Sequence, residues 1–315
     1  MIDEQPTVTV ISVNWNGRFY LQTCLPTLQK QTYNNFNILI VDNGSTDDSI
    51  AWLAENYPEV TIIPLEENLG FAAANNIGIQ ATDSPLIALL NNDTLVDEGW
   101  LAALVTAVSP PTTGSVASCI VRWNEPHLLD SAGIQLDRSG IAWNRGWGQS
   151  VEIGTQPCPV FGPSAAAALY RRKMLDEIGL FDEDYFAYYE DVDLAWRAQR
   201  AGWDCQYAPD ARVRHWHSAT SAKTPHFKNF LNGRNKLWTI VKNYDWPALL
   251  WFAPIIIAYD MMAAIYQSGK SRNFAPVRGR WQALKSFKQM RAKRQSSRRQ
   301  VQMSPLPFPG KQPPF

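Results

Sequence analysis

Four short apolar runs constrain the fold of this chain more than any other feature of its sequence. The runs cover residues 7–13, 36–41, 60–64 and 86–90, and Val, Ile and Leu dominate them. Apolar residues at helical spacing fill the intervals at residues 18–30, 50–56 and 71–80. Strands that alternate with helices form right-handed βαβ crossovers, so the pattern predicts an α/β fold with a mostly parallel sheet.

Polar residues end each of these runs. Asn14 follows the first run, Asp42 and Asn43 end the second, and residues 68–70 (Asn-Leu-Gly) follow the third. The carboxyl ends of parallel strands share one edge of the sheet, where open α/β sheets bind their ligands. The first run is followed by neither G-x-G-x-x-G nor a Walker motif, which argues against a standard dinucleotide site and a P-loop. A nucleotide at this edge would therefore depend on the loops and on a metal.

The fourth run stops at Asn91, Asn92 and Asp93. Carboxylate and amide oxygens suit a hard cation such as Mg²⁺ or Mn²⁺, which in turn holds a phosphate. A helix cap is the alternative, because Asp97 and Glu98 indicate the start of another helix. These residues alone leave both interpretations open.

A second acidic cluster, Glu190, Asp191 and Asp193, lies at the start of a predicted helix. Like charges in close contact raise a carboxyl pKa, which suits Asp191 to general-base catalysis near neutral pH. The alternative is structural, since a helix dipole stabilises acidic residues in the first turn. Further on, His215 and His217 allow one histidine metal ligand.

The region between residues 116 and 160 shows no regular pattern of comparable strength. Trp123, Trp143 and Trp147 lie there among Gly, Asn and Arg residues. Exposed aromatic rings stack on sugar faces, but core packing is the commoner use of Trp.

Cysteine usage and the amino terminus predict a cytoplasmic protein. The four cysteines contain no C-x-x-C pair and no disulfide framework, and no apolar run near Met1 resembles a signal peptide.

Charge is distributed unevenly along the chain. Of 29 basic residues, 12 lie in residues 261–315, which contain no acidic residue; residues 1–260 hold 17 basic and 29 acidic residues. Before this basic segment, residues 246–259 are almost wholly apolar, but they contain two prolines and are followed by Asp260. An apolar run of this length is short for a transmembrane helix. A buried helix and an interfacial helix both fit. The basic segment that follows contains Trp281, Leu284 and Phe287 at helical spacing, which favours binding to an anionic membrane surface. The acidic body argues against nucleic acid as the partner of these charges.

Seven segments together resemble the GT-A fold glycosyltransferases of family 2, and within that family the bacterial rhamnosyltransferase-like branch. They cover about residues 7–221 and are residues 41–47 (Val-Asp-Asn-Gly-Ser-Thr-Asp), 68–71 with 75–78 (Asn-Leu-Gly-Phe and Asn-Asn-Ile-Gly), 90–94 (Leu-Asn-Asn-Asp-Thr), 179–183 (Gly-Leu-Phe-Asp-Glu), 189–194 (Tyr-Glu-Asp-Val-Asp-Leu), 201–203 (Ala-Gly-Trp), and His215 with Ser218 and Thr220.

The resemblance implies an inverting glycosyltransferase that moves a sugar, rhamnose from dTDP-rhamnose in this branch, onto a cell-surface or lipid-linked glycan. It implies that Asp93 and His215 hold the divalent cation and that Asp191 is the catalytic base. Asn91 replaces the first Asp of the family's D-x-D motif, and Asn75 stands where many relatives have a basic residue. The substrate- or nucleotide-binding residues implied are Asn14, Asp42, Asn43, Asn68, Gly70, Asn75, Asn91, Asn92 and Glu190.

The implied organisation is a GT-A domain over residues 1–230, with a nucleotide-sugar half to about 110 and an acceptor half after it. Residues 231–300 are expected to be helical and membrane-associating, and residues 301–315 are expected to be a disordered Pro-rich tail. The protein is expected to be peripheral on the inner face of the cell membrane.

Two alternative functions remain. A sugar-nucleotide nucleotidyltransferase shares the layout but needs a Gly-rich loop after the first strand; a non-catalytic nucleotide-sugar-binding protein would not need Asp93 and Asp191.

Overall fold

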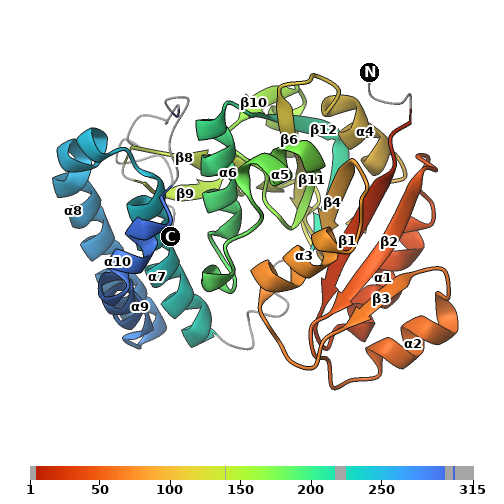
Figure 1. The fold of residues 1–315 in the computed structure, drawn as a ribbon, viewed down its shortest axis with the longest axis horizontal. Coiled ribbons are helices and arrows are strands. Elements are labelled where there is room, and N and C mark those ends of the chain that lie inside the picture. Colours follow the sequence, from red (N-terminus) through yellow and green to blue (C-terminus); the bar gives the residue numbers. More distant parts are fainter. Residues whose placement is uncertain (1–4, 139, 217–224, 295–300, 302–315) are drawn as a thin grey trace.

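The computed structural model describes residues 5–138, 140–216, 225–294 and 301. Within them, a ten-stranded mixed sheet runs through the molecule in the order β10-β12-β6-β11-β4-β1-β2-β3, with β5 and β7 attached beside it and β8 and β9 forming a separate pair (Figure 1). The strands are β1 (Val8–Asn14), β2 (Phe36–Asp42), β3 (Thr61–Pro64), β4 (Leu86–Leu90), β5 (Thr94–Val96), β6 (Thr113–Arg122), β7 (Leu129–Ser131), β8 (Ile134–Leu136), β9 (Ala142–Asn144), β10 (Cys158–Val160), β11 (Ala167–Arg171) and β12 (Asp204–His215).

The four predicted strands, β1 to β4, pair in parallel, which confirms the α/β fold. Side chains alternate between the two faces of the sheet, because successive residues of a strand point to opposite sides. Val8, Val10 and Ile40 pack under α1 (Arg18–Leu28), α2 (Ser49–Asn56) and α4 (Trp100–Ala107). Ile11 and Leu89 pack under α3 (Phe71–Gln80), α5 (Arg172–Ile178) and α6 (Glu190–Ala201). Thr9 and Ser12 are the buried polar residues within β1, and the larger polar side chains Asn14 and Asp42 lie at the ends of β1 and β2.

The other half of the sheet is less regular, and the sequence did not predict β6. This strand is buried along nine of its ten residues, yet it contains Gly114, Ser115 and Ser118 rather than a run of large apolar residues. Gly114 lies against Met174 and Trp203, and Ser118 accepts a hydrogen bond from Trp100 Nε1 at 3.0 Å. Small and polar residues fit here because packed elements approach both faces closely, and this conceals the strand in a hydrophobicity pattern.

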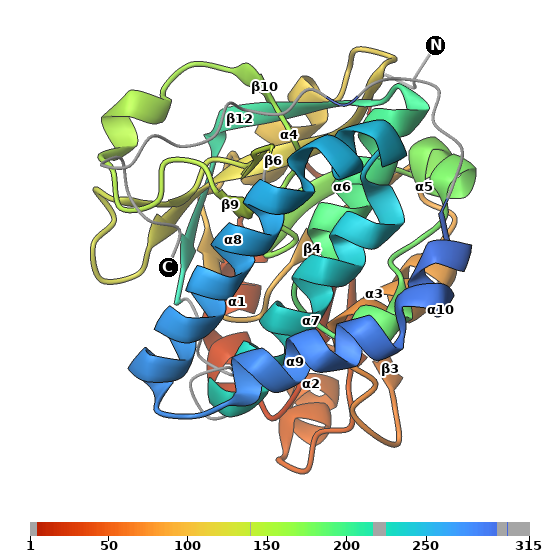
Figure 2. The same ribbon diagram turned by 90° about the vertical axis from the view of Figure 1, so that its left-hand side faces the viewer.

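Four C-terminal helices cover the side of α6 that faces away from β1–β3. They are α7 (Pro225–Asn243), α8 (Trp246–Ser271), α9 (Ala275–Lys285) and α10 (Phe287–Ala292). In Figure 2, α8 and α9 lie toward the viewer and α7 lies between them and the body. α7 crosses residue 230, where the boundary of the GT-A domain was predicted.

The sequence predicts an apolar segment that Asp260 interrupts and that is short for a transmembrane helix, whereas α8 continues through Pro254 and Asp260 as one helix of 26 residues. Pro247 lies in its first turn, where a missing N–H costs nothing. By length and composition alone, Leu249–Ser271 could cross a membrane, a property it shares with core helices of soluble proteins, although only 22% of its most apolar window is buried. The predicted disordered tail, apart from Val301, lies outside the described residues, as do Ser218 and Thr220.

Candidate active site

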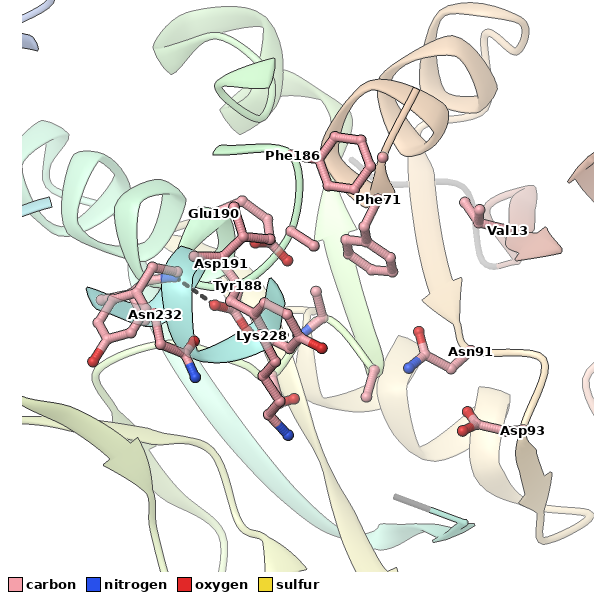
Figure 3. Close-up of a pocket in the computed structure, with 18 of the residues that line it drawn as sticks. Val13, Phe71, Asn91, Asp93, Phe186, Tyr188, Glu190, Asp191, Lys228 and Asn232 are labelled. Atoms are coloured by element: carbon pink, nitrogen blue, oxygen red, sulfur yellow. Dashed lines mark hydrogen bonds between the residues drawn. The ribbon is translucent and has the colours of Figure 1, made fainter. Parts of the chain in front are cut away.

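A pocket of about 450 Å³ opens at the carboxyl ends of β1, β2 and β4. Figure 3 shows two groups of side chains on opposite sides of it: Asn91 and Asp93 follow β4, while Glu190 and Asp191 begin α6. Nine predicted site residues line this pocket, namely Asn43, Asn68, Gly70, Asn91, Asn92, Asp93, Glu190, Asp191 and His215.

Asp93 and His215 meet because of strand pairing. β5 runs antiparallel to the end of β12, with Thr94 opposite His215, so two residues far apart in sequence become neighbours. His215 Nε2 lies 3.3 Å from Asp93 Oδ1, and His215 Nδ1 lies 2.8 Å from Asp130 Oδ2. Asp93 is followed at once by β5, and α4 begins only at Trp100, so Asp93 does not cap a helix.

The electrostatics of His215 follow from this arrangement. Burial alone lowers an imidazole pKa, but the hydrogen bonds with Asp130 and Asp93 prevail and raise the pKa of His215 to about 9. The imidazole is therefore held by a carboxylate on each side. Contact between Nδ1 and Asp130 fixes the ring so that Nε2 faces Asp93, which is how carboxylates commonly orient metal-binding histidines.

This donor set fits a divalent cation. The Asp93 carboxylate and the amide oxygens of Asn91 and Asn92 suit Mn²⁺ or Mg²⁺. His215 Nε2 would join them once a bound cation displaces its proton. Among the residues that the structure describes, no group of three or more His, Cys, Asp or Glu side chains is arranged to hold a metal ion by itself. A cation bound by these donors would keep open coordination positions for further oxygen ligands.

Asp191 lies at the opposite wall, partly buried in the first turn of α6. Its Oδ1 accepts a hydrogen bond from the N–H of Val192 at 2.8 Å and its Oδ2 one from the N–H of Ala165 at 3.3 Å. Burial raises the pKa of Asp191, and these two donors only partly offset it. Burial and the adjacent Asp191 charge together raise the pKa of Glu190 well above its ordinary range. Asp191 is thus the stronger candidate for the base, because its pKa is raised less than that of Glu190.

Asp193 does not crowd Asp191, and that part of the sequence argument is wrong. Its carboxylate points to the other side of α6, where it contacts Arg197 Nε at 2.9 Å, Lys242 Nζ at 2.9 Å and Asn243 Nδ2 at 2.7 Å. Burial raises the pKa of Asp193, but Arg197 and Lys242 outweigh it, so the pKa of Asp193 is lowered. Desolvation, rather than repulsion from Asp193, raises the pKa of Asp191.

The loop before α6 has an unusual backbone. Phe186, Tyr188 and Tyr189 have φ angles of 65°, 68° and 70°, a region that costs non-glycine residues energy. Asn235 of α7, fully buried, donates from Nδ2 toward the carbonyl oxygens of Tyr185, Ala187 and Tyr188 at 3.0, 2.8 and 2.7 Å. A helix outside the sheet therefore holds the loop that positions Glu190 and Asp191.

Gly70, which precedes α3, contacts the same loop. Its φ angle is 88°, and a Cβ there would lie 2.6 Å from the carbonyl oxygen of Phe186. That oxygen accepts a hydrogen bond from the N–H of Ala72 at 3.1 Å. Only a glycine lets the loop approach the start of α3 this closely.

Three predicted nucleotide-binding residues are not among the described residues that line the pocket. Asn14 and Asp42 are fully buried beneath it: Asn14 Nδ2 donates to Asp42 Oδ2 at 2.8 Å, and Asn14 Oδ1 accepts from Asn92 Nδ2 at 2.8 Å. They support Asn92 and the turn that begins at Ser45, whose N–H donates to Asp42. Asn75 is buried in α3 and donates to the carbonyl of Phe71, so it faces its own helix.

The structure adds residues that sequence reasoning missed. Asp130 lies on a three-residue strand with no periodicity to reveal it, and Lys228 and Asn232 line the pocket from α7, beyond the matched segments. Of the three tryptophans considered, Trp143 lines the pocket. Trp123 packs on Trp216 with ring centroids 4.7 Å apart, and Trp147 lies under Arg122.

Comparison with known proteins places these observations in a family. Residues 9–179 match the model of glycosyl transferase family 2. The chain is 28% identical over 262 residues to N-acetylglucosaminyl-diphospho-decaprenol L-rhamnosyltransferase of Mycobacterium tuberculosis, covering 73% of this chain and 85% of the relative. It is 29% identical over 191 residues to pre-mycofactocin glycosyltransferase of the same organism, covering 57% of this chain and 37% of the relative.

Solved structures share the fold. A mannosyltransferase of Pyrobaculum calidifontis in complex with GDP-Man and Mn²⁺ superposes with a TM-score of 0.56 at 18% identity, over 92% of this chain and 84% of that one. GalNAc-T7 with UDP, GalNAc and Mn²⁺ superposes with a TM-score of 0.63 at 16% identity, over 80% of this chain and 50% of that one.

Proposed function

The chain belongs to glycosyl transferase family 2 and is a glycosyltransferase, and from this premise we propose that it transfers a sugar, with inversion, from a nucleoside diphosphate to a glycan hydroxyl. The supporting observation is that a candidate base and a candidate cation site face each other across one pocket. Asp191 would bind the acceptor hydroxyl and remove its proton as the oxygen attacks the anomeric carbon. Asp93 and His215 would hold the donor diphosphate through a divalent cation, Mn²⁺ or Mg²⁺, which neutralises charge on the leaving group when bound.

The loops at the strand ends would orient the two substrates. Asn43 Nδ2 and Asn68 Oδ1 are 3.0 Å apart, and Asn43 Oδ1 accepts from the N–H of Leu69 at 2.9 Å, so this corner of the pocket is rigid. Asn14, Asp42 and Asn92 form the floor beneath the nucleoside side of the pocket. We assign the nucleoside diphosphate to this side and the acceptor to the opposite wall, where Asp191 lies near Lys228 and Asn232 of α7. Positioning of both substrates would supply much of the acceleration.

The donor and acceptor are proposed from the relatives. The mycobacterial relative is by name an L-rhamnosyltransferase that acts on N-acetylglucosaminyl-diphospho-decaprenol, a lipid-linked sugar. For this chain we propose rhamnose from dTDP-rhamnose as the donor sugar, a lipid-linked or cell-surface glycan as the acceptor, and a peripheral location on the inner face of the cell membrane. Residues 1–230 would then form the GT-A domain, and residues 231–300 the membrane-associating part.

Incubation of the full chain with a panel of nucleotide sugars, with Mn²⁺, Mg²⁺ or EDTA, tests the proposal. Slow hydrolysis of one donor, dependent on the cation, is expected even without an acceptor. Asp191→Asn is expected to lose this activity, whereas Asp176→Asn, an exposed carboxylate on α5, should keep it. Thermal stabilisation by a nucleoside diphosphate with Mn²⁺ but without turnover of any sugar would indicate a binding protein instead.

A further inference from the structure

The outward side of α8 is apolar along its length. From Leu250 to Tyr266 every exposed side chain is apolar or a tyrosine, and Leu250, Trp251 and Ile265 are 73%, 80% and 71% exposed. The exposed residues recur at three- and four-residue intervals and form one stripe, namely Leu250, Trp251, Pro254, Ile257, Ala258, Met261, Met262, Ile265 and Tyr266. A surface helix of a soluble protein normally has the opposite polarity.

The charge of this helix faces inward. Asp260 is the only charged residue between Trp246 and Gly269, and it is buried. Its carboxylate contacts Lys236 Nζ of α7 at 3.1 Å and Arg280 Nε of α9 at 2.8 Å. Removal of one partner from a buried ion pair is strongly destabilising, because it leaves a buried charge unpaired. The contacts of Asp260 therefore fix which side of α8 faces outward. The apolar stripe is therefore a defined surface of the folded protein.

α9 packs against α8, also exposes apolar side chains, and adds positive charge. Phe274, Val277, Trp281 and Leu284 are exposed at helical spacing. Exposed basic residues border them, namely Lys270, Arg272, Arg278, Lys285, Lys288 and Arg291, and no acidic residue follows Asp260 in the sequence. Lys270 Nζ lies 5.8 Å from the ring of Tyr266, and Lys285 Nζ lies 5.6 Å from the ring of Trp281. Aromatic rings next to basic side chains are typical of the zone between lipid headgroups and acyl chains.

We propose that this surface of α8 and α9 binds the interface of an anionic lipid bilayer, with both helices parallel to the membrane plane. Apolar side chains would enter the boundary between headgroups and acyl chains, and the bordering lysines and arginines would contact anionic headgroups. The inference rests on the peripheral membrane location proposed above and names the surface that would bind, but it does not depend on the chemistry of the pocket. Failure of vesicle binding would therefore leave the proposed glycosyl transfer in place.

Two other occupants fit the surface less well. In a spanning helix, lipid would surround Asp260, whereas here α7 and α9 cover it with Lys236 and Arg280. In a symmetric dimer through this face, the basic borders of both copies would approach each other without acidic partners from the same segment.

Flotation of the full chain with phosphatidylcholine vesicles, with and without phosphatidylglycerol, tests the proposal. The chain is expected to float with the anionic vesicles at low salt and to be released in part at high salt. Ile257→Glu and Ile265→Glu should each lower the partition coefficient about tenfold or more, because burial of each isoleucine is lost. Ile153→Glu is a matched control, since Ile153 is 58% exposed against 57% for Ile257 and lies outside α8 and α9. It should float like the unchanged chain.

Thermal melting of each variant and light scattering in solution complete the design. Equal melting temperatures would assign the loss of flotation to the surface rather than to unfolding. Three outcomes would overturn the proposal: no flotation of the full chain at low salt, an equal loss with Ile153→Glu, or resistance of the bound chain to carbonate extraction, which would indicate a spanning helix. A dimer that both α8 variants convert to monomer, without vesicle binding, would assign the face to a second copy.

Discussion

Substitution of Asn235 by alanine tests how the loop before α6 is held. The side chain has two amide hydrogens, directed at three carbonyl oxygens of residues 185, 187 and 188 within 3.0 Å. Two net hydrogen bonds contribute about 2 kcal/mol, and carbonyls left unsatisfied raise the loss to about 2–4 kcal/mol. The same loop contains three non-glycine residues with positive φ, which cost about 1 kcal/mol or more each, so without Asn235 it is expected to relax.

The expected result is a loss of turnover larger than the loss of donor binding. Displacement of a reacting group by about 1 Å costs roughly 100-fold in rate. Asp93 and His215 are attached to the sheet, so KM for the donor should change by no more than about threefold while kcat falls about 10- to 100-fold. Initial rates of donor hydrolysis over a range of donor concentrations, with urea unfolding of the same samples, give both quantities.

Lys236→Met is the matched control, because Lys236 is the next residue of α7, is also buried, and contacts Asp260 of α8 rather than the loop. It should lower stability to a comparable degree and leave kcat per folded molecule unchanged. An Asn235→Ala enzyme with the kcat of the unchanged chain, or an equal loss of kcat in Lys236→Met, would refute the claim that Asn235 positions the loop.

Four further predictions concern the pocket. Asp191→Asn should reduce kcat by about 100-fold or more and leave donor-induced thermal stabilisation in place; near-normal turnover would assign the base to Glu190. Because burial raises the pKa of Asp191, its ionised form is lost at higher pH than for an ordinary aspartate, so the acid limb of kcat/KM should lie above about pH 4, and a limb below that value would contradict the assignment. Asp93→Ala should abolish both cation dependence and donor binding, whereas full activity of the unchanged chain in excess EDTA would exclude a metal role. Asp130→Asn should weaken Mn²⁺ binding, measured by electron paramagnetic resonance with nucleoside diphosphate present, about 10- to 100-fold, because His215 is no longer oriented by a carboxylate; unchanged binding would limit Asp130 to packing.

The first half of the fold was predictable because each strand from β1 to β4 is a short β-branched or apolar run that ends in a polar turn. β6 was not, because close packing on both faces requires small residues such as Gly114, and these conceal the strand. Asp260 was misinterpreted for a related reason: a linear pattern shows a charge within an apolar run but not the partners, Lys236 and Arg280, that bury it.

Site residues within one compact motif were predictable, whereas contacts between residues far apart in the sequence were not. Asp93 and Glu190 lie in compact motifs that resemblance identifies directly. The contact of Asp130 with His215 requires β7 beside β6 and β6 beside β12, an arrangement that no local pattern encodes. Asn235 was missed for the same reason, since it acts on a loop almost fifty residues earlier in the chain.

The dual contacts of α7 have a consequence for engineering. One side of this helix holds the loop before α6 through Asn235 and reaches Asp182 and Asp193 through Lys242, while Lys236 joins it to α8. In a chimera built from two relatives, a loop from one parent and α7 from the other would lose these matched contacts. A chimera should therefore take residues 182–193 and α7 from the same parent. The two segments are separated in the sequence, but they form one structural unit.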